Sequence, residues 1–156
     1  MSQRYSTAGM YLCYAVETTA GTRPTTGYIQ IPEIKSIPSL NAAPEQIEST
    51  TLLETTYKTY VEGLKDLGGA LEFTANLTAD LITVWNTCNS AHDALTGGKM
   101  MWFCVVHPSL ANAVFFKGDP APLGLNEASV GSMAETTLYV TAESAPEWQT
   151  KPTLST

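Results

Sequence analysis

Basic residues are scarce in this sequence, and their scarcity excludes the function classes that depend on them. The 156 residues include 8 Lys and Arg against 15 Asp and Glu, which gives a formal net charge of −7 at pH 7. Proteins that bind phosphate backbones or anionic membrane surfaces use clustered Lys and Arg, whereas the basic residues here are scattered. The sequence therefore predicts neither specific nucleic-acid binding nor membrane binding.

Cysteine and histidine are also few, with three Cys and two His. Cys13, Cys88 and Cys104 each lie in an apolar or amphipathic run, so we expect reduced thiols that pack as small hydrophobic groups. A zinc site that combines Cys88 and Cys104 with His92 and His107 is disfavoured, because the last Cys and His lie three residues apart on one strand pattern and point to opposite faces. We expect no metal and no cofactor.

Motifs that carry catalysis are absent as well. The sequence contains no Gly-rich phosphate loop and no Gly-x-Ser-x-Gly nucleophile elbow. Neither histidine has a recognisable partner motif for nucleophilic catalysis. Fifteen acidic residues give many carboxylate pairs, whose separation depends on the fold, so a hydrolase that uses an acid pair stays an alternative. We expect a protein that is not an enzyme.

Long hydrophobic runs are missing from the sequence. The apolar run near the start, from Met10 to Val16, is short and ends in acid and Thr. It fits neither a signal peptide nor a membrane span, so we expect synthesis in the cytoplasm. A length of 156 residues is enough for one core, and we expect a single domain over residues 1–156.

What the sequence does contain is a series of short strand patterns. The run Ala70–Leu77 alternates cleanly, with Leu71 and Phe73 on its apolar face. Further strands are expected over Met10–Glu17, Tyr28–Ile31, Lys99–His107, Asn112–Gly118 and Thr136–Glu143. The continuous apolar run that ends at His107 is typical of a strand covered on both faces. Many short strands with one helix predict a mainly β fold, an antiparallel β-sandwich or barrel.

The period changes from two to 3.6 at Thr78, which we predict as the N-cap of the helix. Its apolar stripe includes Leu81, Trp85 and Cys88, and Gly97 follows its expected end at about Leu95. This is the only convincing helix in the sequence, and we expect it to flank the β-structure.

A polar, Thr-rich connection of about thirty residues, from Ser39 to Gly69, interrupts the strand patterns. Structureless connections of this length are uncommon inside a compact domain and are usually functional or disordered. Disorder is disfavoured because the connection carries many large apolar residues: Ile47, Leu52, Leu53, Tyr57, Tyr60, Val61, Leu64 and Leu67. We expect neighbouring subunits to cover them.

Three stretches of the sequence resemble the tail tube proteins of long-tailed, non-contractile phages. They read AGTRPTTGYIQIPEIKSIPSLNAAPEQIESTTL, YVEGLKDLGGALEFTANLT and TLYVTAESAPEW. The most distinctive pieces are Pro-Glu-x-Ile-Glu-x-Thr, which contains residues Glu45 to Thr50, and Gly-Leu-Lys-Asp from Gly63 to Asp66. The three stretches are spread over most of the chain, from Ala20 to Trp148.

The resemblance implies a β-sandwich flanked by one helix, with six copies closed into a ring and rings stacked into a hollow tube. Such a tube conducts double-stranded DNA from capsid to host cell, without catalysis and without specific DNA binding. The implied partners are further copies of the chain, a tape measure protein inside the tube, and distal tail and terminator proteins at its ends. The implied location is the virion tail, after synthesis in the host bacterial cytoplasm.

The resemblance also assigns roles to parts of this chain. The long connection, about residues 39–67, maps onto the loop through which rings stack, and residues 144–156 onto an extended C-terminal tail. Within the loop we expect Leu52, Leu53, Tyr57 and Tyr60 to contact the next ring. In the tail, Trp148 is expected to meet a partner or to pack down a terminal arm.

The lumen wall is assigned from the alternation of one strand. Glu72, Thr74 and Asn76 lie opposite the apolar face of Ala70–Leu77. If this strand belongs to the inner sheet, these side chains point into the channel and give it a wetted, negative lining.

The alternative to a tube is a soluble β-sandwich module that binds carbohydrate or protein, with Trp148 or Trp102 as a stacking residue. It predicts a monomer with a concave aromatic site, whereas a tube protein forms rings or polymers.

Overall fold

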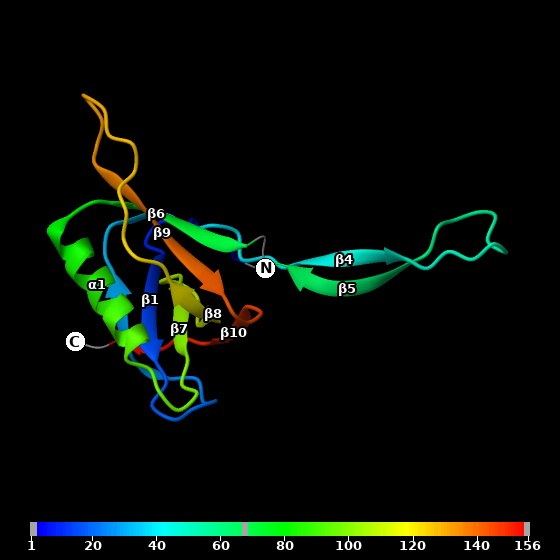
Figure 1. Ribbon diagram of the computed structural model, residues 1–156, viewed down its shortest axis with the longest axis horizontal. Helices are drawn as coiled ribbons and strands as arrows, with labels where there is room; N and C mark the ends of the chain where they lie inside the picture. The colour runs from blue at the N-terminus through cyan, green and yellow to red at the C-terminus, as the bar shows by residue number, and fades with distance from the viewer. Residues whose placement is uncertain (1–2, 67–68, 155–156) are drawn as a thin grey trace.

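Strands dominate the computed structural model, which describes residues 3–66 and 69–154. The strands are β1 (Tyr11–Val16), β2 (Thr26–Ile31), β3 (Ile34–Ser36), β4 (Ala43–Glu48), β5 (Tyr60–Asp66), β6 (Ala70–Asn76), β7 (Met101–Val106), β8 (Asn112–Pro120), β9 (Glu135–Ala142), β10 (Glu147–Thr150) and β11 (Thr153–Leu154). The helix is α1 (Ala79–Asp93), and it flanks the sheet (Figure 1). The predicted mainly β fold with one helix is confirmed.

Most strands belong to one curled sheet. Its order is β11-β2-β1-β7-β8-β9-β6-β3, with β10 paired to β8 outside this path. The pairings are antiparallel, as predicted, apart from a short parallel pair between β11 and β2. β3 is short, lies at the edge and has an irregular register with β6, in line with the prolines that flank it.

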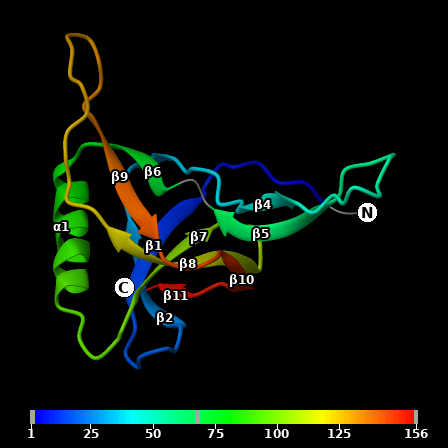
Figure 2. The same ribbon diagram turned by 45° about the vertical axis from the view of Figure 1, so that its right-hand side comes forward.

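The C-terminal segment, for which an extended tail over residues 144–156 was expected, forms two short strands that close part of this sheet on itself, and residues 155 and 156 lie outside the described part of the chain. β10 pairs with the start of β8, and β11 pairs with β2, with only Lys151 and Pro152 between them. The segment therefore joins two strand edges on either side of β1 and β7 (Figure 2). Pairing satisfies backbone groups that these edges would otherwise present to water.

Two hydrophobic cores lie on the two faces of β1 and β7. The first contains Leu81, Trp85 and Cys88 of α1 together with Phe73 and Phe103 from the sheet. The second includes Cys13, Tyr28, Trp102, Cys104 and Phe115. Because β7 sends alternate side chains into each core, all six of its residues are buried, as predicted for a strand covered on both faces.

The helix begins and packs as the sequence predicts. Thr78 is the N-cap, and its hydroxyl accepts a hydrogen bond from the Leu81 backbone N–H at 3.2 Å. Trp85 is fully buried, and its Nε1 donates to the Ala121 carbonyl at 2.9 Å. The helix ends at Asp93, slightly before the expected end at Leu95. Among the described residues, no helix has the length and apolar character needed to cross a membrane.

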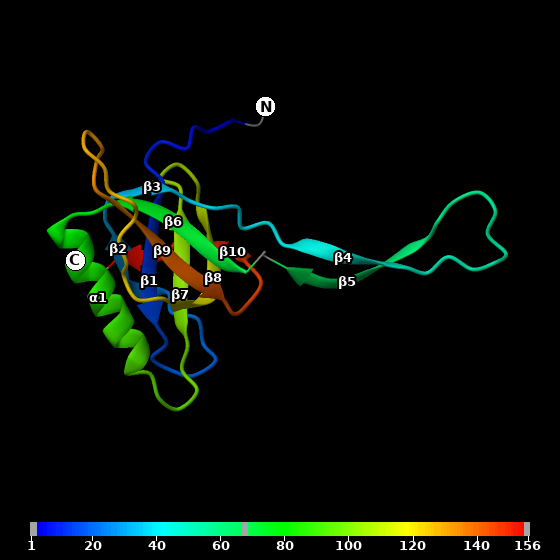
Figure 3. The same cartoon turned by 45° about the horizontal axis from the view of Figure 1, so that its top comes forward.

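Most of the long connection over about residues 39–67 is a β-hairpin. β4 and β5 pair with each other as a separate two-stranded sheet and project far from the body (Figure 3). Residue 67 lies outside the described part of the chain. The sequence did not predict this hairpin, because both faces of β4 are exposed. A strand exposed on both faces has no alternation of apolar and polar residues.

Candidate assembly interface

The tip of the hairpin, residues 49–59, holds a defined conformation through its Ser and Thr residues. The Ser49 backbone N–H donates to the Thr59 carbonyl at 2.8 Å, and the Thr59 N–H donates to the Thr50 hydroxyl at 2.9 Å. The Ser49 and Thr59 hydroxyls lie 3.2 Å apart. Such side-chain to backbone bonds replace ladder bonds where a chain leaves a strand. The Thr-rich composition thus shapes the tip.

A glutamate fixes the turn within the tip. The Glu54 N–H donates to the Thr51 carbonyl at 3.1 Å, and its carboxylate accepts from the N–H groups of Thr56 and Tyr57 at 2.9 and 3.2 Å. These bonds favour the charged form and lower the pKa of Glu54. The residues on either side of this turn are therefore presented in a fixed arrangement.

The residues presented there are large and apolar. Leu52 and Leu53 are 103% and 93% exposed, Tyr57 is 77% exposed and Tyr60, at the start of β5, is half exposed. Ile47, Val61 and Leu64 on the strands are exposed as well. Single exposed hydrophobic residues are ordinary, but a contiguous group marks an interaction surface. The sequence predicted this group as an interaction surface, and the hairpin holds all four predicted stacking residues away from the body.

The residues predicted to face a lumen lie together on the outer face of β6. Glu72 is exposed, while Thr74 and Asn76 are partly buried, and the intervening Leu71, Phe73 and Ala75 are in the first core. Their cross-strand partners on β9 are Tyr139, Thr137 and Glu135. The predicted alternation is confirmed, and it creates a polar stripe across two strands.

Charge on this stripe is mainly negative. The Asn76 amide donates to the Glu33 carboxylate at 3.4 Å, and Lys35 of β3 pairs with Glu135. Glu72 adds a further exposed carboxylate on β6. One lysine thus accompanies three carboxylates on the face shared by β3, β6 and β9.

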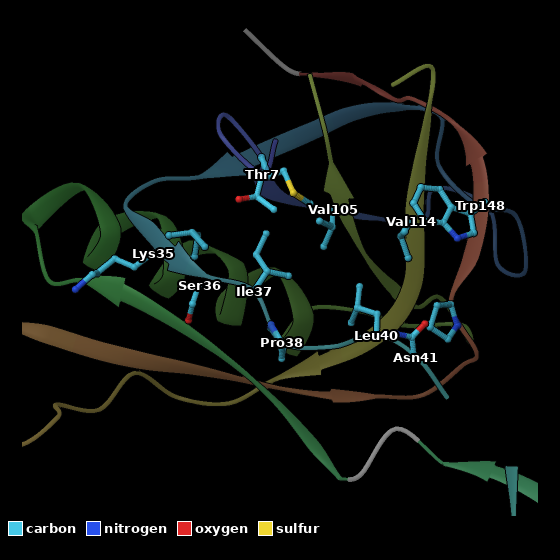
Figure 4. A pocket seen from close by; sticks show the side chains of 13 residues that line it. Thr7, Lys35, Ser36, Ile37, Pro38, Leu40, Asn41, Val105, Val114 and Trp148 are labelled. Carbon is cyan, nitrogen blue, oxygen red and sulfur yellow. The ribbon is translucent and has the colours of Figure 1, made fainter. Parts of the chain in front are cut away.

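Trp148 lies on β10 beside an apolar groove that sequence reasoning missed. The groove has a volume of about 540 Å³ and lies between the β3–β4 connection, β8 and β10 (Figure 4). Its apolar lining includes Met10, Ile37, Leu40, Val114 and Trp148. Trp148 remains 61% exposed. Trp148 was the one lining residue that stood out in the sequence, because the lining comes from segments far apart in the chain.

The other aromatic residue considered for ligand stacking has a structural role. Trp102 is only 6% exposed, so its proposed role as a stacking residue is wrong. Its Nε1 donates to the buried Glu17 carboxylate at 2.9 Å, which also accepts from the N–H groups of Met100 and Gly21 at 2.8 and 3.2 Å. This buried carboxylate is fully hydrogen-bonded within the body and was not singled out in the sequence.

Cys13 and Cys104 lie opposite each other on β1 and β7, with the Cys13 thiol 3.5 Å from the Cys104 carbonyl, whereas Cys88 lies in the other core. Cys13, Cys88 and Cys104 are free and buried, as predicted. His92 contacts Asp119 at 3.3 Å, while His107 contacts the Ser6 carbonyl. Within residues 3–66 and 69–154, no three or more His, Cys, Asp or Glu residues form a group that could hold a metal ion.

Comparison with known proteins gives a likeness of fold. No family model and no curated protein matches the sequence. The structure is similar to a chain in the cryo-EM structure of the anti-feeding prophage (AFP) baseplate, symmetrised sixfold, with a TM-score of 0.63 and 10% sequence identity. The match covers 96% of this chain and 98% of that chain. At this identity, the likeness shows that the two chains share a fold over nearly their whole lengths.

Proposed function

We propose that this chain is a structural protein of a phage tail, specifically a tail tube protein. Six copies close into a ring, and rings stack into a hollow tube that conducts double-stranded DNA from capsid to host cell. The fold shared with a chain of a sixfold-symmetrised prophage baseplate supports a role in such an assembly. The sequence resemblance to tail tube proteins supports the tube in particular.

One observation carries the proposal. The β4–β5 hairpin projects from the body and ends in Leu52, Leu53 and Tyr57, which are almost wholly exposed in the isolated chain. A hairpin on its own is only marginally stable in water and gains nothing by displaying apolar residues to solvent. A neighbouring subunit that covers the tip stabilises the hairpin and removes its apolar side chains from water. The hairpin is therefore the element through which one ring contacts the next.

The outer face of β6 and β9 supplies the lumen wall in this proposal. Six chains of charge −7 make the ring strongly negative, and the wall carries Glu72 with Thr74 and Asn76. At physiological ionic strength the Debye length is about 8 Å, so repulsion acts where DNA comes close to the wall. Such a wall offers phosphate few cations, and it conducts DNA without binding it specifically.

The proposed protein has no catalytic role. Its partners are copies of itself, a tape measure protein in the lumen, and distal tail and terminator proteins at the tube ends. Its proposed location is the virion tail, with synthesis in the cytoplasm of the host bacterium.

Electron microscopy of the purified protein tests the assembly. The wild type is expected to form rings or tubes, and L52S/L53S is expected to remain folded but to lose stacking, because each anchor contributes about 1 to 3 kcal/mol when buried between subunits. Thr55→Ser changes the same tip without removing an apolar side chain and serves as the control. Tubes of normal length from L52S/L53S contradict the proposed role of the hairpin.

Charge reversal tests the lumen wall. Glu72→Lys is expected to leave tubes intact and to slow DNA ejection from virions, most strongly at low salt, because a lysine attracts phosphate. Glu127→Lys introduces the same charge change on the exposed loop before β9 and is the matched control. Ejection rates that do not respond to Glu72→Lys at any salt concentration place the wall elsewhere.

A second candidate is a soluble β-sandwich module that binds a protein or a carbohydrate. The groove beside the exposed Trp148 favours it, since binding sites are concave and largely apolar. This candidate requires a stable monomer at high concentration, and analytical ultracentrifugation separates it from the tube protein.

A further inference from the structure

We propose that the groove beside Trp148 on one copy of the chain receives the hairpin tip of a second copy. This inference rests on the proposed function and adds the acceptor surface to it. The donor is the tip that carries Leu52, Leu53 and Tyr57, and the acceptor is the groove between the β3–β4 connection, β8 and β10.

The two surfaces match in chemistry. The groove is lined by aliphatic side chains of Met10, Ile37, Leu40 and Val114, with the Trp148 ring at its rim. It continues into a second hollow that shares Trp148, Val114 and Met10 with it. Leucine and tyrosine side chains on a turn are suited to such a hollow, because an aromatic or aliphatic anchor in a pocket supplies most of the energy of an interface.

The two surfaces also complement each other in charge. From residue 43 to residue 66 the hairpin has five acidic and two basic residues; the tip itself carries Glu54 and Lys58, and the excess of negative charge lies on the strands that follow the tip toward the acceptor. Arg4 lines the second hollow, and Lys35, which also pairs with Glu135, lines the first; the described residues that line the two hollows include no carboxylate. In a chain with nearly twice as many acidic as basic residues, a surface without carboxylates is the one that an acidic hairpin approaches without repulsion.

The hairpin of the same copy is directed away from this groove. Leu40 and Asn41 line the groove, and β4 begins two residues later at Ala43 and runs outward from the body (Figure 1). Seven residues of β5 at about 3.4 Å each carry the tip more than about 20 Å from the strand base. The groove and the tip of one chain thus lie at opposite ends of the hairpin, and the occupant comes from another copy.

This arrangement has a consequence for the assembly. Donor and acceptor are different surfaces on the same chain, so the contact is heterologous, and every added copy presents a new free tip or groove. A heterologous contact that does not close on itself propagates in one direction. The contact therefore gives the stack a polarity, with tips at one end and grooves at the other.

Tryptophan fluorescence reports occupation of the groove directly. Trp85 and Trp102 are buried in the body, and Trp148 is 61% exposed. Assembly of the wild type is expected to shift the emission to shorter wavelength, and the shift is expected to be absent in L52S/L53S, which lacks the tip anchors. Trp148→Phe keeps an aromatic ring and is expected to assemble without the shift. A wild type that assembles with Trp148 still fully accessible to a soluble quencher overturns the inference.

Complementation tests the pairing of the two surfaces. Trp148→Glu is expected to raise the concentration needed for polymerisation by at least about 30-fold, the equivalent of one strong interface anchor. L52S/L53S is expected to have the same effect. Mixed together, the two variants restore one intact tip and one intact groove, so a discrete complex that contains both variants and does not elongate is expected in analytical ultracentrifugation.

Control variants and outcomes separate this inference from the proposed function. Ile82→Ser removes an apolar side chain from the exposed face of α1 and is expected to polymerise as the wild type does. Tubes from Trp148→Glu at wild-type concentration overturn the inference and leave the proposed function in place. A mixed complex from the two variants, with no ring or tube from the wild type, supports the inference and rejects the tube.

Discussion

β7 and β4 are both six-residue strands, but the environments of their side chains are opposite. Every residue of β7 is buried, whereas every residue of β4 is exposed. The side chains of MWFCVV belong alternately to the two cores, while the side chains of APEQIE stay exposed although its backbone pairs with β5. The body is therefore held by side-chain burial within the chain, and the hairpin extends residues whose burial depends on another copy. The same division decides what each substitution does.

The largest loss of stability is expected when a buried tryptophan is removed, and an exposed tryptophan provides the comparison. Trp85→Ala removes a fully buried ring and its 2.9 Å hydrogen bond to the Ala121 carbonyl, so it is expected to lower the free energy of unfolding by about 3 to 5 kcal/mol. Trp148→Ala is the matched control and is expected to change it by less than about 1 kcal/mol in dilute protein. Urea denaturation measures both. Equal losses contradict the division into body and interface.

The next largest effect concerns the buried carboxylate of Glu17. Burial raises its pKa, but hydrogen bonds from the Trp102 indole and from the N–H groups of Met100 and Gly21, together with the positive charge of Lys117, outweigh burial and leave the pKa below the ordinary 4.5. Glu17→Ala leaves three donors without their acceptor and is expected to cost about 3 kcal/mol in urea denaturation at pH 7.

The pH dependence of this group follows from the direction of its pKa shift. The folded chain holds the Glu17 proton more weakly than the unfolded chain does, so the contribution to stability is fully present above pH 4.5. It is lost as the pH falls through the lower pKa of the folded state. Unfolding curves between pH 7 and pH 3 are expected to show a shallower acid-induced loss of stability for Glu17→Ala than for the wild type. Parallel pH profiles contradict this role.

The strands and the helix of the body are predictable from the sequence because their buried side chains recur with the period of the element. Phe73 and its alternate neighbours marked β6, and Thr78 with the stripe through Trp85 marked α1. The hairpin and the C-terminal strands show no such periodicity of apolar residues. Both faces of β4 are exposed, and β10 pairs with the edge of β8 through backbone groups that any sequence supplies.

The candidate interface was only half predictable. Leu52, Leu53 and Tyr57 stood out because they are apolar residues in a polar segment, a signal that composition carries. The groove has no local signal, since Met10, Leu40 and Val114 come together only through the sheet topology. Glu17 was missed for the same reason, because its partner Trp102 is 85 residues away in the chain.

A smaller effect is expected from adding one methyl group at two glycines in strands. A Cβ at Gly118 would lie 2.6 Å from Val140 Cγ1 and 2.9 Å from Phe103 Cδ2, both in the first core. Gly118→Ala is therefore expected to cost about 1 to 3 kcal/mol in thermal unfolding. A Cβ at Gly63 in β5 would lie 3.1 Å from Ile47 Cδ1, which can rotate away on the exposed hairpin, but also 3.1 Å from Glu45 Cβ and 3.3 Å from the Glu45 carbonyl oxygen, so the β4 backbone must shift slightly. Gly63→Ala is expected to cost less than Gly118→Ala, and an equal or larger loss would show that the hairpin is packed as tightly as the body.

The smallest change in the free energy of unfolding is expected at the hairpin tip, although the substitution there removes two large apolar side chains. Leu52 and Leu53 are as exposed in the folded chain as in an unfolded one, so their contribution to burial is the same in both states and cancels. L52S/L53S is therefore expected to change the free energy of unfolding by less than about 0.5 kcal/mol, provided that urea denaturation is done in protein too dilute to assemble. Leu138→Ser makes the same chemical change at a site that is 1% exposed and is expected to destabilise the chain by several kcal/mol. At concentrations where the wild type assembles, association adds stability through mass action, and a difference between L52S/L53S and the wild type is expected to appear and to grow with concentration. A loss above about 1 kcal/mol in the dilute protein would mean that the tip packs on its own body in solution, and the hairpin would then not be free to reach another copy.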